Sequence, residues 1–68
     1  MKVYVFKTSV SHSDLDSVER IIDTLIPHTQ WNFDFDDCDN ILRVVSKRDI
    51  SEVVCTGLAK FGYLCQEL

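Results

Sequence analysis

The sequence predicts a single α+β domain over residues 1–68 whose elements follow the order βαββαβ. Strand-like segments rich in β-branched and aromatic residues alternate with two segments in which apolar residues recur every three or four positions. Polar turn residues separate these segments. Hydrophobic residues make up 46% of the chain, which favours a packed core over disorder.

The first strand is expected over residues 2–8, where Val3 to Phe6 are all β-branched or aromatic. A polar loop follows. The first helix then runs to about Ile26, because its apolar side chains fall on one face. Pro27 ends this helix, since proline disfavours helical geometry at the residue before it.

Two serines in the polar loop are candidate N-cap residues of the first helix, Ser11 and Ser13. A serine hydroxyl accepts a hydrogen bond from the free N–H groups of a first helical turn. Ser13 is followed three residues later by Asp16, which resembles a capping box.

An antiparallel hairpin is expected in the middle of the chain. Residues 30–35 alternate aromatic and polar side chains, which is typical of a strand with one buried face. Residues 36–40 form a polar turn, and residues 41–47 form the next strand. The short connection makes these strands an antiparallel pair.

The second helix is expected to start near Asp49, which can cap it with Glu52 three residues later. Gly62 follows its apolar stripe and is expected just past the helix end. Residues 63–68 then form a short last strand. Two right-handed βαβ crossovers would give a four-stranded antiparallel sheet with strand order 4-1-3-2 and both helices on one face. This is the ferredoxin-like fold, which hosts many unrelated functions.

The end of the chain has the most specific local pattern. From Leu58 to Leu68, an apolar helix residue is followed four positions later by Gly62 and Tyr63 and then by a short strand. With this ending, the chain resembles heavy-metal-associated domains of the copper-chaperone type over nearly its full length. Four further apolar residues fall where that family places its hairpin core: Phe33, Phe35, Leu42 and Val44.

The resemblance implies a metal motif, Met-x-Cys-x-x-Cys, in the loop after the first strand. With Val18 at the first core position of the family helix, the two cysteine positions hold Ser11 and Asp14, and the methionine position holds Ser9. Soft thiolates bind Cu(I), whereas a hydroxyl and a carboxylate are hard oxygen ligands. We therefore expect no cofactor and no metal at this loop, where helix capping explains Ser11 and Asp14. Tyr63 matches the aromatic residue that supports the family's metal loop.

Ser11, His12 and Asp14 also include the residue types of a catalytic triad. Neighbouring loop residues rarely present the required geometry, and no glycine-rich oxyanion loop accompanies them. We therefore do not expect an enzyme.

The charge pattern bears on the partners of this chain. Its net charge is −4 and it has no basic stripe, so we expect neither nucleic acid nor a membrane as a partner. Four aspartates gather at the hairpin turn: Asp34, Asp36, Asp37 and Asp39. They lack the spacing of an EF-hand loop, so a solvated acidic turn is the preferred interpretation and a weak Ca²⁺ or Mg²⁺ site is the alternative.

The three cysteines, Cys38, Cys55 and Cys65, are an odd and widely spaced set, as is typical of free thiols in a reducing compartment. The sequence shows no signal peptide and no apolar run long enough to span a membrane, so we expect the cytoplasm. In the predicted topology the cysteine positions do not converge on one metal site.

The open face of the predicted sheet is apolar for a surface that meets water. The resemblance places Tyr4 and Phe6 toward the helices, and six residues are then expected to face outward as one patch: Val3, Val5, Ile41, Val45, Leu64 and Leu68. If the register is shifted by one residue, Tyr4 and Phe6 face outward instead, so the first strand exposes two large apolar side chains in either case. A contiguous apolar patch usually marks an interface. We therefore expect an interaction module that docks on another protein or forms a homodimer. The alternative is a metal-handling protein that uses a non-standard site.

Overall fold

The computed structural model describes residues 1–36 and 39–68. Its elements in chain order are β1 (Lys2–Thr8), the short 3-10 turn η1 (His12–Asp14), α1 (Leu15–Leu25), β2 (Gln30–Asp34), β3 (Ile41–Ser46), α2 (Ser51–Lys60) and β4 (Cys65–Glu67). The predicted order βαββαβ is confirmed. The last strand is shorter than predicted, because the chain is still reversing direction up to Leu64. In the described part of the chain, neither helix combines the length and the apolar character needed to cross a bilayer.

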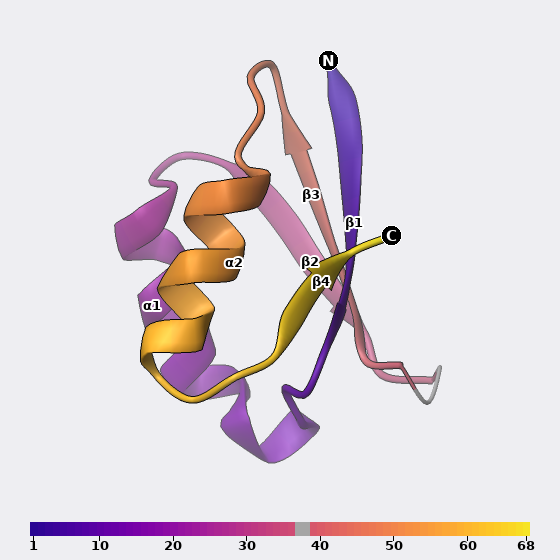
Figure 1. Cartoon of the computed structure of the whole chain (residues 1–68), viewed down its shortest axis with the longest axis vertical. Coiled ribbons are helices and arrows are strands. Elements are labelled where there is room, and N and C mark those ends of the chain that lie inside the picture. Colours follow the sequence, from indigo (N-terminus) through magenta and orange to yellow (C-terminus); the bar gives the residue numbers. More distant parts are fainter. Residues whose placement is uncertain (37–38) are drawn as a thin grey trace.

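The strands form one antiparallel sheet in the order β2-β3-β1-β4, which is 4-1-3-2 read from the opposite edge. β1 pairs with β3 from Lys2 opposite Ser46 to Lys7 opposite Ile41, whereas only three residues of β4 pair with β1. Figure 1 shows α1 and α2 together on one side of this sheet, with the other side open. The molecule therefore has two layers, and one sheet face is available for contacts.

The core lies between the helices and the inner face of the sheet. Tyr4 and Phe6 of β1 and Leu42 and Val44 of β3 are all buried there, as the sequence predicts. They meet seven buried residues of the helices and loops: Val10, Val18, Ile22, Ile26, Ile50, Val54 and Leu58. Because burial of one such side chain contributes about 1.5–3 kcal/mol, this cluster is the main source of stability.

The two helices approach closely where α2 carries a glycine. A Cβ atom added at Gly57 would lie 2.7 Å from Leu25 Cδ2 and would also clash with Leu25 Cδ1. Glycine is a poor helix former, by about 1 kcal/mol relative to alanine. At this position it gives Leu25 of α1 room to pack against the backbone of α2.

The predicted glycine at the end of α2 is confirmed. Gly62 has a φ of 88°, a left-handed conformation that favours glycine. Its N–H donates to the Ala59 carbonyl at 3.0 Å, and the Tyr63 N–H donates to the Leu58 carbonyl at 3.1 Å. These two bonds form a Schellman motif that turns the chain back toward β4. At the other end of α2, the N-cap residue is Ile50, so the predicted cap at Asp49 with Glu52 is wrong. The Asp49 carboxylate lies one residue earlier and accepts the Ser51 N–H at 2.9 Å.

Candidate functional sites

The loop between β1 and η1 is where the family resemblance implies a metal, and both of its ends are anchored. The Ser9 N–H donates to the Leu64 carbonyl at 3.1 Å, and the Ser9 hydroxyl accepts the Leu64 N–H at 2.8 Å. The Thr8 hydroxyl accepts the Val10 N–H at 3.2 Å and donates to the Asn40 carbonyl at 2.7 Å. The side chain of Val10 is fully buried. The loop is therefore held between the segment before β4 and the β2–β3 hairpin.

Ser11 and Asp14, the two residues at the cysteine positions, are hydrogen-bonded to each other. Asp14 Oδ2 accepts the Ser11 N–H at 3.1 Å and the Ser11 hydroxyl at 2.8 Å, while the Asp14 N–H donates to the Ser11 carbonyl at 3.0 Å. The predicted pairing of Ser13 with Asp16 is therefore wrong. Helical structure begins earlier than predicted, with η1, so the capping residues also lie earlier in the chain.

The Asp14 carboxylate is stabilised in its charged form. Its pKa is lowered mainly because the Ser11 backbone N–H and hydroxyl donate to it, with a smaller contribution from the Tyr63 hydroxyl. The ring of His12 lies against Phe35 instead, with 5.3 Å between the ring centroids. The residues of the triad pattern thus have local structural roles, with Ser11 and Asp14 closing a turn and His12 packing on an aromatic ring.

Two carboxylates of the acidic hairpin, those of Asp34 and Asp39, have partners in the chain itself. Asp34 Oδ1 accepts the Asp36 N–H at 3.0 Å, and Asp34 Oδ2 lies 3.4 Å from the Arg43 guanidinium. Asp39 Oδ1 lies 3.8 Å from the Lys7 ammonium. Both carboxylates are therefore directed toward cations of neighbouring strands.

Two residues of the predicted sites, Asp37 and Cys38, lie outside the described residues. Within residues 1–36 and 39–68, no three His, Cys, Asp or Glu side chains gather as a metal-binding group. Structural zinc sites, for comparison, take four such ligands.

The open face of the sheet carries four of the predicted patch residues side by side. Val3 lies directly opposite Val45, and Val5 faces the same side two residues further along β1. The Leu68 N–H donates to the Val5 carbonyl at 2.9 Å, which places Leu68 beside Val5. Val3 and Leu68 are 54% and 69% exposed. We call Val3, Val5, Val45 and Leu68 the apolar corner.

The other two predicted patch residues lie apart from this corner. Ile41 is on the open face but is only 6% exposed, so its prediction as an exposed interface residue is wrong. In the register it lies between Lys7 and Asp34, and each of these long or charged neighbours is held in an ion pair. Leu64 is exposed but lies four residues before Leu68. Gln66, which pairs with Lys7, lies between them.

An open hollow of about 240 Å³ adjoins the apolar corner on the side of β2. It is lined by Val3, Gln30, Trp31, Asn32, Arg43 and Val45. Val3 and Val45 belong to the corner, and most of the remaining lining is polar. The corner therefore has an exposed side chain, Leu68, on one flank and a concave surface on the other.

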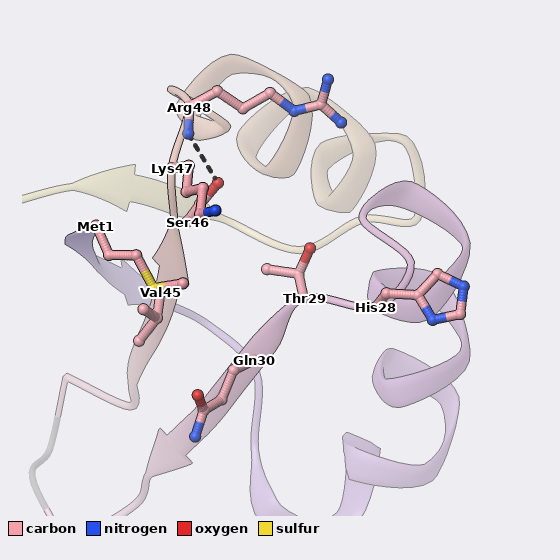
Figure 2. Close-up of a pocket in the computed structure, with 8 residues that line it drawn as sticks. All are labelled: Met1, His28, Thr29, Gln30, Val45, Ser46, Lys47 and Arg48. Carbon is pink, nitrogen blue, oxygen red and sulfur yellow. Dashed lines mark hydrogen bonds between the residues drawn. The ribbon is translucent and has the colours of Figure 1, made fainter.

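A larger hollow, of about 420 Å³, lies where β1 and β2 begin and β3 ends. It is lined by Met1, His28, Thr29, Gln30, Val45, Ser46, Lys47 and Arg48. Figure 2 shows the side chains of His28 and Arg48 extending away from Met1 and Val45. The backbone N–H of Arg48 donates to the Ser46 hydroxyl at 3.2 Å, and this hydrogen bond fixes the turn after β3. The nitrogen groups around this hollow therefore do not point to a common centre.

The structure brings together two cysteines that sequence reasoning had separated. Cys55 Sγ of α2 and Cys65 Sγ of β4 lie 3.5 Å apart. Both residues are half-buried and pack against the core. The prediction that the cysteine positions do not converge is therefore wrong for this pair.

A signal for this proximity exists in the sequence. Cys55 lies seven residues before the turn at Gly62, and seven residues of helix are about 10 Å long. Cys65 lies three residues after the same turn, and three residues of strand are also about 10 Å long. Because the strand runs back alongside the helix, two residues at equal distances from the turn come level with each other.

The Cys65 thiol is neutral in its resting form. Burial raises the pKa of the Cys65 thiol well above its usual range, and the hydrogen bond with Cys55 raises it further. Cys65 therefore keeps its proton at neutral pH.

No family model matches the chain, and no curated protein or solved structure matches it.

Proposed function

We propose that this chain is a small non-enzymatic interaction domain of the ferredoxin-like, heavy-metal-associated type without the family's thiolate loop. In this proposal it pairs with a second copy of itself through the apolar corner and works in the cytoplasm. The observation that supports it is the apolar corner itself, four adjoining aliphatic side chains on the face that no helix covers (Figure 1). Aliphatic surface removed from water contributes about 25 cal/mol per Å², and such patches usually mark interfaces.

The shape of the open face favours a second copy as the partner. Leu68 flanks the corner on the β4 side, and the hollow beside Val45 flanks it on the β2 side. A two-fold axis parallel to the strands, between β1 and β3, would exchange these two flanks between facing sheets. Leu68 of each copy would then enter the hollow of the other, in an isologous contact between sheets about 10 Å apart.

The charges around the corner are compatible with this pairing. The corner itself contains no charged residue, and its nearest charged neighbour in the register, Arg43 opposite Val5, is paired with Asp34 at 3.4 Å. Two corners can therefore meet without burying an unpaired charged side chain. The net charge of −4 acts at longer range, where salt screens it beyond about 8 Å at physiological ionic strength.

The test is the oligomeric state of matched lysine variants in sedimentation velocity over a concentration series. Leu68→Lys should raise the dimer dissociation constant at least about tenfold, since it places a charge in the hollow. Leu64→Lys is the control, because Leu64 is exposed on the same face but lies outside the corner. A wild-type chain that stays monomeric at millimolar concentration, or an equal effect of both variants, would refute the homodimer. Circular dichroism checks that each variant is folded.

A second candidate function, metal handling by a non-standard site, is favoured by one observation. Cys55 and Cys65 place two soft sulfur donors 3.5 Å apart. A competition titration with a Cu(I) chelator tests it in the wild type and in Cys55→Ser. Stoichiometric binding that is lost in Cys55→Ser would favour metal handling, and binding that survives in Cys55→Ser would point back to the loop after β1.

A further inference from the structure

We propose that Cys55 and Cys65 form a reversible disulfide that fastens the edge strand β4 to α2. The two sulfur atoms lie 3.5 Å apart, and a disulfide requires about 2.05 Å. Closing the bond therefore needs a combined movement of about 1.5 Å, which rotation of two side chains can supply. α2 and β4 already pack against each other, so no element has to be displaced as a whole.

A disulfide needs only the two sulfur atoms that are present, whereas a metal site would need additional ligands. Tetrahedral zinc requires four ligands, and no third His, Cys, Asp or Glu joins these two sulfurs in the described part of the chain. Both cysteines remain partly accessible, so a small oxidant can reach them.

The reaction is a thiol–disulfide exchange with a low-molecular-weight disulfide of the glutathione type. The Cys55 thiolate attacks one sulfur of the oxidant, its S–S bond breaks, and one small thiol leaves with the released proton. The Cys65 thiol then gives up its proton and its sulfur attacks Cys55 Sγ, which expels the second small thiol. Two protein thiols are oxidised to one disulfide, and one small disulfide is reduced to two thiols.

The bond would act on the least supported part of the sheet. β4 pairs with β1 over three residues, compared with six for β3. Beyond this pairing, backbone bonds from Leu68 to Val5 and from Ser9 to Leu64 hold its ends. A covalent link to α2 would prevent β4 from separating while the helix is folded.

The experiment uses the full chain with Cys38→Ser, so that only the proposed pair can react. The protein is incubated with oxidised glutathione and digested with trypsin without reduction. Trypsin cuts after Arg48 and Lys60, and Lys60 lies between the two cysteines. The peptides Asp49–Lys60 and Phe61–Leu68 should therefore stay joined and separate only after reduction. Adding Cys55→Ser or Cys65→Ser should leave a lasting glutathione adduct instead.

Melting of the oxidised and reduced forms provides a second measurement. The bond closes a loop of about 11 residues, so oxidation should raise Tm on the order of 10 °C, and Cys55→Ser should abolish this rise. Glutathione adducts on both cysteines, or thiols that stay reduced in excess oxidant, would overturn the proposal. A Cu(I) complex of the pair that blocks oxidation at one equivalent would overturn it in favour of a soft-metal site.

Discussion

The two faces of the sheet differ although the same strands build both. On β3, Leu42 and Val44 point toward the helices and are completely buried. Their neighbours Arg43 and Val45 point to the open side and are only partly covered. The inner face is apolar at Tyr4, Phe6, Leu42 and Val44 of the two central strands. The open face is apolar at the corner around Val3 and ion-paired at the opposite end, around Ile41.

This difference shows that apolar character and burial are separate properties on an uncovered sheet face. On the inner face, Tyr4, Phe6, Leu42 and Val44 of the two central strands are buried beneath the helices. On the open face, a residue is buried only if long side chains on adjacent strands lie across it. Ile41 has such neighbours in Lys7 and Asp34, whereas Val3 lies near the end of its strand and stays exposed.

The largest effect is expected from a matched pair of substitutions on β3. Val44→Ala should lower the free energy of unfolding by about 2–3 kcal/mol, because it removes two methyl groups from a closed core. Val45→Ala, on the adjacent open-face residue, should lower it by less than about 1 kcal/mol. Urea denaturation monitored by circular dichroism measures both. At concentrations at which the chain is monomeric, equal losses would mean that the open face is covered within a single chain.

Ile41→Ala should behave like an inner-face substitution despite its place on the open face. We expect a loss of about 2 kcal/mol, because Ile41 is only 6% exposed. The same denaturation experiment, compared with Val45→Ala, measures it. A loss as small as that of Val45→Ala would show that the ion pairs leave Ile41 accessible to water.

The inner face of the central strands was predicted from the family resemblance, because Val3 to Phe6 are all apolar and alternation alone does not say which face of β1 is buried. Tyr4, Phe6, Leu42 and Val44 are all placed correctly. The burial of Ile41 was not predictable in this way, because it depends on side chains from two neighbouring strands. The Cys55–Cys65 contact depends on how the chain turns at Gly62, a relation between elements that periodicity within one element does not report.

A smaller effect is expected from the Arg43–Asp34 ion pair, whose side chains are 43% and 35% exposed. Arg43→Met keeps an aliphatic chain beside Ile41 and removes the charge, so it should cost less than about 1 kcal/mol. That cost should vanish at about 1 M salt, where the screening length is about 3 Å. Arg43→Ala is the comparison, because its additional loss from uncovering Ile41 should persist at high salt. A salt-independent loss in Arg43→Met would assign the role of Arg43 to packing.

The smallest effect is expected at Asp14, on the loop that joins β1 to the helical layer. Hydrogen bonds from Ser11 lower the pKa of the Asp14 carboxyl in the folded state. The folded state therefore prefers the ionised form, and this contribution to stability is fully present above the ordinary aspartate pKa and is lost as the pH falls through the lowered one. Asp14→Asn should accordingly reduce Tm at neutral pH, and its difference from wild type should shrink from about pH 5 downward. Ser11→Ala should show part of the same pH dependence, because its hydroxyl is one of the two Ser11 donors. If the difference between Asp14→Asn and wild type stayed constant down to low pH, the capping box would have no electrostatic role.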